Sequence, residues 1–374
     1  MSVHEERTQG GAKRYKVKWR DGGRGTPSHS RTFTRRRDAE AWDAEVERRR
    51  QLGPIAVQTL DAGRESLDEY VTGTWAKAHA AHLTEKTRAG YGSLYDAHIG
   101  PFLGPVPLRE LTPDRIAVWQ TQRQAAGAGV EAIRKAHTLL GNVLQRAVES
   151  QRIAHNPQRS VRKLKPSPKR EVRPLAPQSV EAMRRALWRD TTESRHRDAT
   201  IVSILAYAGL RPGEARELTW GNVHDKTIVV NASKTGQRRT VRLLTPLASD
   251  LAAWKLDCTA TASADPVFPS VDGRAFTVEA FKSWGRRAFA RAAAAADRPD
   301  ATPYTARHSF ASLLLHEGRN VIYVARQLGH GANLTLLTYG HVIDELDGEP
   351  QLPAEDAIRI ARGNGVPVVF LSEV

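Results

Sequence analysis

Four short segments in the second half of the chain combine basic side chains with two tyrosines. Arginine stays charged and binds phosphate through two parallel hydrogen bonds, lysine and histidine transfer protons, and a tyrosine hydroxyl can bond covalently to phosphorus. These residue types suit the cutting of a phosphodiester through a covalent intermediate, which keeps the bond energy for rejoining. The sequence has no GxxxxGK[ST] loop that would bind a nucleotide as an energy source. The segments are residues 208–220 (AGLRPGEARELTW), 233–236 (SKTG), 303–315 (PYTARHSFASLLL) and 327–341 (QLGHGANLTLLTYGH).

The local sequence of the first segment predicts how its charged residues are presented. A helix is expected to end at Gly209, and Arg211 then projects from a turn. Pro212 suits the first position of the next helix, and Glu214 falls in its first turn, where a carboxylate is favoured. Further along the chain, residues 233–236 predict a hairpin turn that presents Lys234 beside two strands.

In order and spacing, the four segments resemble the catalytic domain of the tyrosine recombinase (phage integrase) family. His330 and Tyr339, separated by nine residues, match the last of the family's motifs. The resemblance implies an integrase with an N-terminal arm-binding domain, a helical core-binding domain and a C-terminal catalytic domain. It also implies the catalytic residues Arg211, Lys234, Arg307, His330 and Tyr339, with Glu214 in support.

One position departs from the family's pattern. The family usually has a histidine three residues before the second arginine, where this chain has Tyr304. A tyrosine can donate a hydrogen bond to a phosphate oxygen, but it is neither a cation nor a base near neutral pH. We therefore expect Tyr304 to be a supporting residue with a weakened role. His308, directly after Arg307, fits a frequent companion in the family and is expected to be structural rather than catalytic.

The resemblance implies a mechanism that needs neither a metal nor a cofactor. Tyr339 would attack the scissile phosphorus, which gives a 3′-phosphotyrosyl bond and a free 5′-hydroxyl. Arg211 and Arg307 would bind the phosphate oxygens, and Lys234 would protonate the leaving 5′-oxygen. Losing one arginine donor is expected to cost about 3–4 kcal/mol.

Charge points to a polyanionic partner. The chain has 56 Lys and Arg against 41 Asp and Glu, a net charge of +15. Residues 1–50 hold 14 basic and 8 acidic residues, and residues 151–175 hold 8 basic residues and one acidic residue. Nucleic acid is therefore the leading partner, with salt-dependent binding. The candidate DNA-binding residues are Lys16, Lys18 and Arg20 in the N-terminal segment and Arg162, Lys163 and Lys165 in the second basic stretch.

The expected fold class is mainly α with small β elements, in several domains. Residues 1–58 predict an arm-type DNA-binding domain, because residues 13–20 (KRYKVKWR) and 30–34 alternate as strands and residues 37–52 form an amphipathic helix. Residues 64–160 predict a helical core-binding domain, which includes a helix capped by Thr112 and Pro113 and a long amphipathic helix over 130–151.

The remaining segments complete the predicted organisation. The five prolines and seven basic residues of 156–177 are typical of an extended basic linker, placed at 161–177 between the domains. Residues 178–345 predict the catalytic domain, with helices and a β-hairpin near 227–243. Residues 346–374 form a tail, helical at 355–362 and strand-like at 366–371, that either packs on its own domain or contacts another protomer.

Other features restrict the location of the protein and its ligands. Cys258 is the single cysteine, so neither an internal disulfide nor a CxxC metal site is expected. His79 and His82 have a spacing that can bind a metal, but no third ligand is nearby in the sequence, and no metal site is predicted. The sequence has no apolar run of membrane-spanning length and no secretory signal, which favours the cytoplasm, in association with the nucleoid, and no membrane partner.

The predicted partner is double-stranded DNA at attachment sites of a phage or mobile element. The resemblance implies a homotetramer on two duplexes, with a host bending protein and a directionality factor as further partners. Two alternatives remain open. A recombinase-derived protein could bind DNA with weakened catalysis, of which Tyr304 would be a sign, or a type IB topoisomerase-like relaxase could use the same cleavage without exchanging partners.

Overall fold

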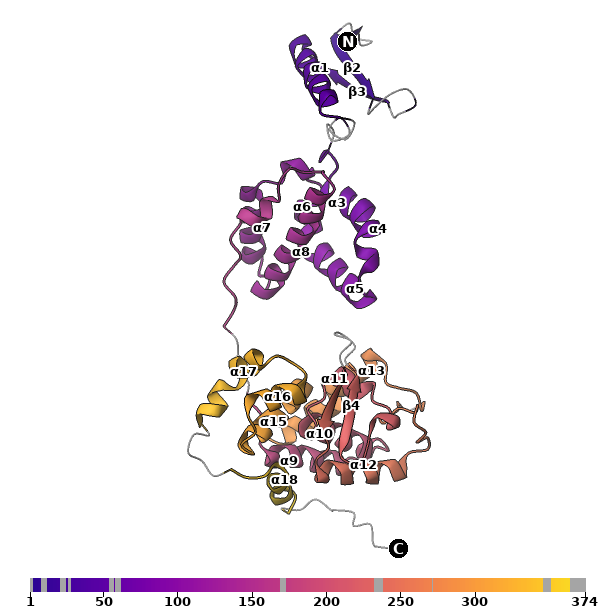
Figure 1. Ribbon diagram of the computed structural model, residues 1–374, viewed down its shortest axis with the longest axis vertical. Coiled ribbons are helices and arrows are strands. Elements are labelled where there is room, and N and C mark those ends of the chain that lie inside the picture. The colour runs from indigo at the N-terminus through magenta and orange to yellow at the C-terminus, as the bar shows by residue number, and fades with distance from the viewer. Residues whose placement is uncertain are drawn as a thin grey trace. The chain divides into compact units, whose positions relative to one another are not determined.

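The computed structural model describes residues 3–7, 12–20, 25, 28–53, 57, 62–168, 173–231, 238–270, 272–345 and 351–363. The chain divides into two compact units, Met1–Lys169 and Arg170–Val374 (Figure 1). Most described residues are helical, and the strands form one three-stranded and one two-stranded antiparallel sheet. The predicted fold class, mainly α with small β elements, is confirmed.

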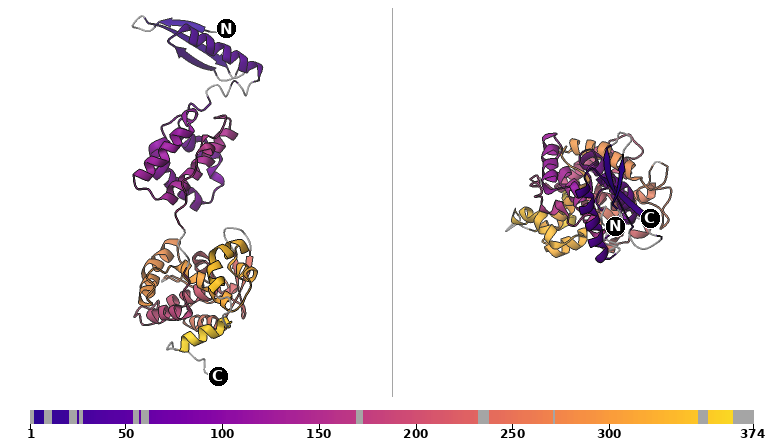
Figure 2. Two further views of the ribbon diagram at one scale, coloured as in Figure 1. Left: turned by 90° about the vertical axis from the view of Figure 1, so that its left-hand side faces the viewer. Right: turned by 90° about the horizontal axis from the view of Figure 1, so that it is seen from above.

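The chain begins with a three-stranded antiparallel sheet in the order β1-β2-β3, with one helix along one face (Figure 2). Val17 and Trp19 of the central strand are buried with Ala39 and Val46 of the helix, so alternate residues of that strand turn to the opposite face. The first strand was not predicted, because its sequence, VHEER, does not alternate. The elements are β1 (Val3–Arg7), β2 (Lys13–Arg20), β3 (Ser28–Phe33) and α1 (Arg36–Gln51).

A bundle of short helices completes the first unit. It contains α3 (Leu67–Tyr70), α4 (Ala76–Ala78), α5 (Glu85–Leu94), α6 (Gly100–Leu103), α7 (Pro113–Ala125) and α8 (Val130–Glu149). Three 3₁₀ turns (Ala80–His82, Leu108–Glu110, Pro157–Ser160) and two π-helical turns (Val71–Trp75, Tyr95–Ile99) lie between or beside them. Thr112 caps α7 through the backbone N–H of Arg115, as predicted from the sequence. The apolar side of α8 is buried in the core of this bundle, including Leu139, Leu140 and Leu144.

The second unit is helical around a β-hairpin. Its helices are α9 (Pro177–Trp188), α10 (Arg195–Tyr207), α11 (Pro212–Arg216), α12 (Thr245–Asp257), α13 (Val278–Trp284), α14 (Ala290–Ala295), α15 (Pro303–His316), α16 (Val321–Leu328), α17 (Ala332–Glu345) and α18 (Ala354–Gly363). Trp220–Asn222 forms a 3₁₀ turn and Gly285–Phe289 a π-helical turn. The hairpin pairs β4 (Thr227–Asn231) with β5 (Arg238–Arg242). The whole of α10 from Asp198 to Tyr207 is buried, so it forms the centre of the core on which the site helices pack.

The basic stretch predicted as an extended linker is shorter than expected. Its start belongs to the helical bundle, because the carbonyl of Arg162 accepts from Gln120 and the carbonyl of Leu164 accepts from Arg134. Its end belongs to the second unit, where the buried Leu175 donates its backbone N–H to Oγ of Ser309. Pro177 already begins α9. Proline content therefore overstated the linker, because a proline also suits the first turn of a helix.

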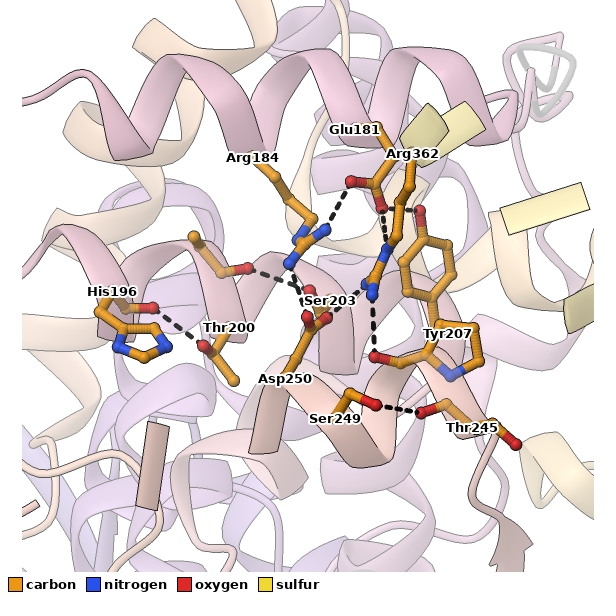
Figure 3. Close-up of polar contacts among 12 residues, drawn as sticks. Glu181, Arg184, His196, Thr200, Ser203, Tyr207, Thr245, Ser249, Asp250 and Arg362 are labelled. Carbon is orange, nitrogen blue, oxygen red and sulfur yellow. Dashed lines mark hydrogen bonds and ion pairs between the residues drawn. The ribbon is translucent and has the colours of Figure 1, made fainter. Parts of the chain in front are cut away.

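The helix predicted in the C-terminal tail packs on its own unit through a buried polar network (Figure 3). Arg362 of α18 pairs with Glu181 of α9 at 3.2 Å and with Asp250 of α12 at 2.6 Å. Arg184 binds the same two carboxylates, and Tyr207 donates its hydroxyl to Glu181. Two cations thus balance two anions inside the core, a condition that buried charges require. The strand-like 366–371 lies outside the described residues.

Candidate active site

Arg211 lies in the turn between α10 and α11, and its geometry agrees with the sequence. Gly209 adopts a φ of 60°, a left-handed conformation that favours glycine, and a Cβ there would lie 2.5 Å from the Phe310 ring. Arg211 then starts α11, and its backbone N–H and its Nη1 each donate to the Glu214 carboxylate at 2.7 Å. The Arg211 side chain remains 35% exposed, which leaves part of it open to a ligand.

Arg307 of α15 is the most buried of the predicted cations. Its guanidinium donates to the backbone carbonyls of Gly209 and Leu328, and lies 3.7 Å from Glu214. Burial, followed by the neighbouring Arg211, lowers the pKa of Arg307 to about 10, so the side chain stays charged at neutral pH. A buried positive charge beside a second arginine favours an anion at this place.

Sequence reasoning missed Arg239, which joins this cluster from β5. Its Nη1 and Nη2 donate to the two carboxylate oxygens of Glu214 at 2.8 and 2.7 Å, and its Nε donates to the carbonyl of Gln327 at 3.0 Å. Burial alone would raise the pKa of Glu214, but the hydrogen bonds from Arg239 and Arg211 hold it at about 2. Three guanidinium groups and one carboxylate therefore meet here, with a net charge of +2. The alternation along RRTVR signals only a strand, so nothing in the sequence marked Arg239.

The C-terminal end of α16 organises the three arginines. The last carbonyls of a helix lack partners within the helix. Here three consecutive ones accept from three different arginines: Gln327 from Arg239, Leu328 from Arg307, and Gly329 from Arg211 at 2.8 Å. Because His330 follows directly, the same helix end delivers the histidine to the cluster. The Nδ1 of His330 lies 3.1 Å from Oγ1 of Thr335, and burial lowers the pKa of the imidazole.

The tyrosine of α17 is buried and held by a histidine of α15. Tyr339 is 1% exposed, and its hydroxyl oxygen lies 2.5 Å from Nδ1 of His308. Burial lowers the pKa of His308 to about 4, so the imidazole is neutral and can accept the phenolic proton. Burial also raises the pKa of Tyr339, while the charge of Arg307 acts in the opposite direction. His308 therefore contacts the candidate nucleophile directly, which the sequence did not indicate.

Other predicted residues have varied positions. Lys234 lies outside the described residues. Tyr304 lies in the first turn of α15 with 55% of its surface exposed, and the cluster's hydrogen bonds among described residues do not involve it. No group of three or more histidine, cysteine or acidic side chains in the described ranges could hold a metal ion. Among the described helices, none has the length and apolar character needed to cross a lipid bilayer.

The candidate DNA-binding residues occupy two surfaces of the first unit. Lys16, Lys18 and Arg20 alternate on β2 on the face away from the buried Val17 and Trp19. A hydroxyl residue of β3 stands beside each, since Lys16 pairs with Thr32, Lys18 with Ser30 and Arg20 with Ser28.

Arg162, Lys163 and Lys165 are exposed in a segment attached to the helical bundle. Gln120 donates to the carbonyl of Arg162, Arg134 donates to the carbonyl of Leu164, and Lys163 lies 3.2 Å from Thr138.

Known proteins resemble this chain in both sequence and fold. Residues 174–345 match the phage integrase family, and residues 69–122 match the family's N-terminal SAM-like domain. A prophage phiRv2 integrase of Mycobacterium tuberculosis is 27% identical over 348 residues, covering 85% of this chain and 86% of the relative. A lambda integrase tetramer bound to a Holliday junction aligns with a TM-score of 0.60 and 17% identity, over 88% of this chain and 94% of that one. The integrase of transposon Tn1549, in complex with transposon right end DNA, aligns with a TM-score of 0.61 and 17% identity, over 75% of this chain and 98% of that one.

A mostly helical unit that brings arginines, a histidine and a tyrosine together has side chains suited to phosphodiester chemistry. The chain is a member of the phage integrase family, the tyrosine recombinases. It is accordingly a DNA strand transferase of a phage or mobile element, and the predicted recognition is confirmed.

Proposed function

We propose that this recombinase cuts and rejoins DNA at attachment sites with Tyr339 as its nucleophile. The observation that carries the proposal is the contact of the Tyr339 hydroxyl with the neutral His308, in a site where Arg211, Arg239 and Arg307 meet. The arginines supply the charge that attracts a phosphate, and the tyrosine supplies an oxygen nucleophile. The two together fit transfer of a phosphoryl group and need no metal.

The chemical step follows from these contacts. The Tyr339 oxygen bonds to the scissile phosphorus, the bond from phosphorus to the 5′-oxygen breaks, and the phenolic proton passes to Nδ1 of His308. Lys234 gives a proton to the leaving 5′-oxygen, and a 5′-hydroxyl of the partner strand later reverses the step. Arg211, His330 and Arg307 stabilise the negative charge that grows on the non-bridging oxygens. Tyr304 has only an exposed hydroxyl to offer, so we assign it a supporting contact.

We propose that the free protein is in a resting state of this mechanism. A hydroxyl on a side chain that is 1% exposed cannot reach a DNA phosphate without a movement of α17 or its neighbours. The raised pKa of Tyr339 also keeps the phenol protonated until a phosphate arrives. We therefore propose that DNA binding exposes Tyr339, which prevents cleavage in the free protein.

The first unit supplies the binding surfaces. We assign arm-type DNA binding to the β-sheet of residues 1–58, because Lys16, Lys18 and Arg20 form one face with serine and threonine hydroxyls beside them. These groups bind phosphates and sugars without reading bases. We assign core-site binding to residues 64–160, with the segment from Arg162 to Lys165 held on the bundle as a backbone contact.

We propose further that four copies act together on two duplexes, as the lambda integrase tetramer does on a Holliday junction. The reaction takes place in the cytoplasm on nucleoid DNA, and a host bending protein and a directionality factor are the partners to seek. The test is recombination between two plasmid-borne attachment sites, taken from the junctions of the integrated element. Wild type should produce recombinant plasmid and Tyr339→Phe none. Relaxation of supercoils without recombinants would instead favour a relaxase, and DNA binding without either product would favour a binding protein.

A further inference from the structure

We propose that Arg239 is a positioning residue for strand transfer, which aligns Arg211 and His330 by holding Glu214 and the end of α16 together. The proposal rests on the proposed function, because it assigns a role within the same site. Arg239 lies on β5, which pairs with β4, so it also connects this hairpin to the arginine cluster.

The contact with Glu214 is the first part of the argument. Arg239 makes two parallel hydrogen bonds to both carboxylate oxygens, an arrangement with fixed geometry. Arg211 uses one of the same oxygens through Nη1 and the other through its backbone N–H. Because Glu214 cannot rotate while Arg239 holds both oxygens, the direction of the Arg211 side chain is set by Arg239.

The contact with α16 is the second part. Arg239 donates through Nε to the carbonyl of Gln327, three residues before His330. Gly329 lies so close that a Cβ there would be 2.8 Å from Cδ and 3.1 Å from Nε of Arg239, and its φ of 67° also favours glycine. The Arg239 side chain thus packs against the backbone that turns the chain toward His330.

Arg239 is too buried to bind the phosphate directly. Its side chain is 10% exposed, against 35% for Arg211, and its Nε, Nη1 and Nη2 atoms all donate within the protein. Its effect therefore passes through Glu214 and α16. Without Arg239, Glu214 would lose two of its four hydrogen bonds and would compete more strongly with the phosphate for Arg211.

The test compares full-length variants on a nicked suicide duplex that carries the element's junction sequence. Arg239→Met should slow formation of the covalent adduct by up to about a hundredfold, the effect that small misplacements in an active site can have. Saturation with DNA should stay at the wild-type concentration. Arg239→Lys, which keeps the charge but not the two parallel bonds, should recover only part of the rate.

A double-mutant cycle separates positioning from direct contact. If Arg239 acts through Glu214, combining Arg239→Met with Glu214→Gln should give a rate no lower than the slower single variant.

Arg242→Met is the matched control, because Arg242 is an arginine of the same strand that pairs instead with Glu317 and Glu355. It should keep the wild-type rate and the wild-type DNA concentration at saturation, even where it lowers thermal stability. Multiplying effects in the double variant, or an unchanged rate in Arg239→Met, would overturn the positioning role. Absence of an adduct from wild type would instead overturn the proposed function itself.

Discussion

Nδ1 of His308 and the hydroxyl oxygen of Tyr339 lie 2.5 Å apart, between α15 and α17 of the second unit, which holds the candidate active site (the catalytic unit). Burial keeps the imidazole neutral, with a pKa of about 4, and raises the pKa of the phenol. With the imidazole proton on Nε2, the phenol donates and Nδ1 accepts. In the proposed mechanism this nitrogen takes up the proton that leaves the phenol during attack.

His308→Gln should slow adduct formation by about a hundredfold or more, because a glutamine amide accepts a hydrogen bond but does not take up the proton. DNA binding in a gel-shift assay should be unchanged, since His308 contacts Tyr339 rather than the surface. The rate is measured at neutral pH on the suicide duplex. A rate equal to wild type would show that His308 is only a packing residue, as the sequence had suggested.

His308 should also make the free energy of unfolding depend on pH. Its pKa falls from the ordinary 6.5 to about 4 on folding, so the unfolded chain binds more protons within that interval. Stability contributed by the neutral imidazole is therefore present above pH 6.5 and lost as the pH falls toward 4. Urea unfolding of the catalytic unit should show a smaller decrease over this interval in His308→Gln than in wild type. Parallel curves for the two proteins would contradict the buried, neutral state of His308.

The sequence predicted the residues that lie in continuous motifs, and missed those whose role depends on distant contacts. Arg211 and Glu214 are three residues apart, and their turn is set by Gly209 and Pro212, so local rules were sufficient. Arg239 meets Glu214 across 25 positions of sequence, where strand alternation gives no information on the partner.

The same limit applies to His308, whose partner Tyr339 is 31 residues away. Its neighbour Arg307 marked the segment, but the direction of the imidazole depends on how α15 and α17 pack. The linker was overestimated for a related reason, since the contacts of Arg162 and Leu164 with the bundle and the burial of Leu175 are tertiary features that composition does not reveal.

The buried network at α18 predicts that two arginines of this helix differ greatly in their contribution to the free energy of unfolding. Arg362→Met should lower the free energy of unfolding of the catalytic unit by about 3–5 kcal/mol, because Glu181 and Asp250 would then share a single cation in the core. Arg359, which is 67% exposed and pairs with Asp356, should change this free energy by at most about 1 kcal/mol when replaced by methionine. Denaturant unfolding measures both, and equal effects would contradict the docking of α18 on its own unit.

This docking changes how the tail should be tested. The sequence led us to expect that deleting residues 346–374 impairs assembly more than DNA binding, but that deletion also removes Arg362 from the core. Truncation after Gly363 keeps α18. If the last residues contact another protomer, this shorter deletion should reduce tetramers on DNA in a gel-shift assay while leaving unfolding unchanged. Undiminished tetramers would exclude that contact.

Phosphate contacts of the basic face of the N-terminal sheet should make binding to the arm site depend on salt. Replacing Lys16, Lys18 and Arg20 together by glutamine should reduce the slope of log affinity against log salt by about 3, near one unit for each lost phosphate contact. Replacing Arg36, Arg48 and Arg50 of α1 is the matched control, because these arginines pair with glutamates of their own helix. A larger effect from the α1 set would place the DNA on the helix rather than on the sheet.

The central claim is tested most directly by mapping the covalent bond. Wild-type protein is trapped on the nicked suicide duplex, digested with a protease and nuclease, and the modified peptide is sequenced by mass spectrometry. We predict a nucleotide attached through a 3′-phosphate to Tyr339, and no adduct from Tyr339→Phe. A nucleotide attached to any other residue, or an adduct that persists in Tyr339→Phe, would contradict the account.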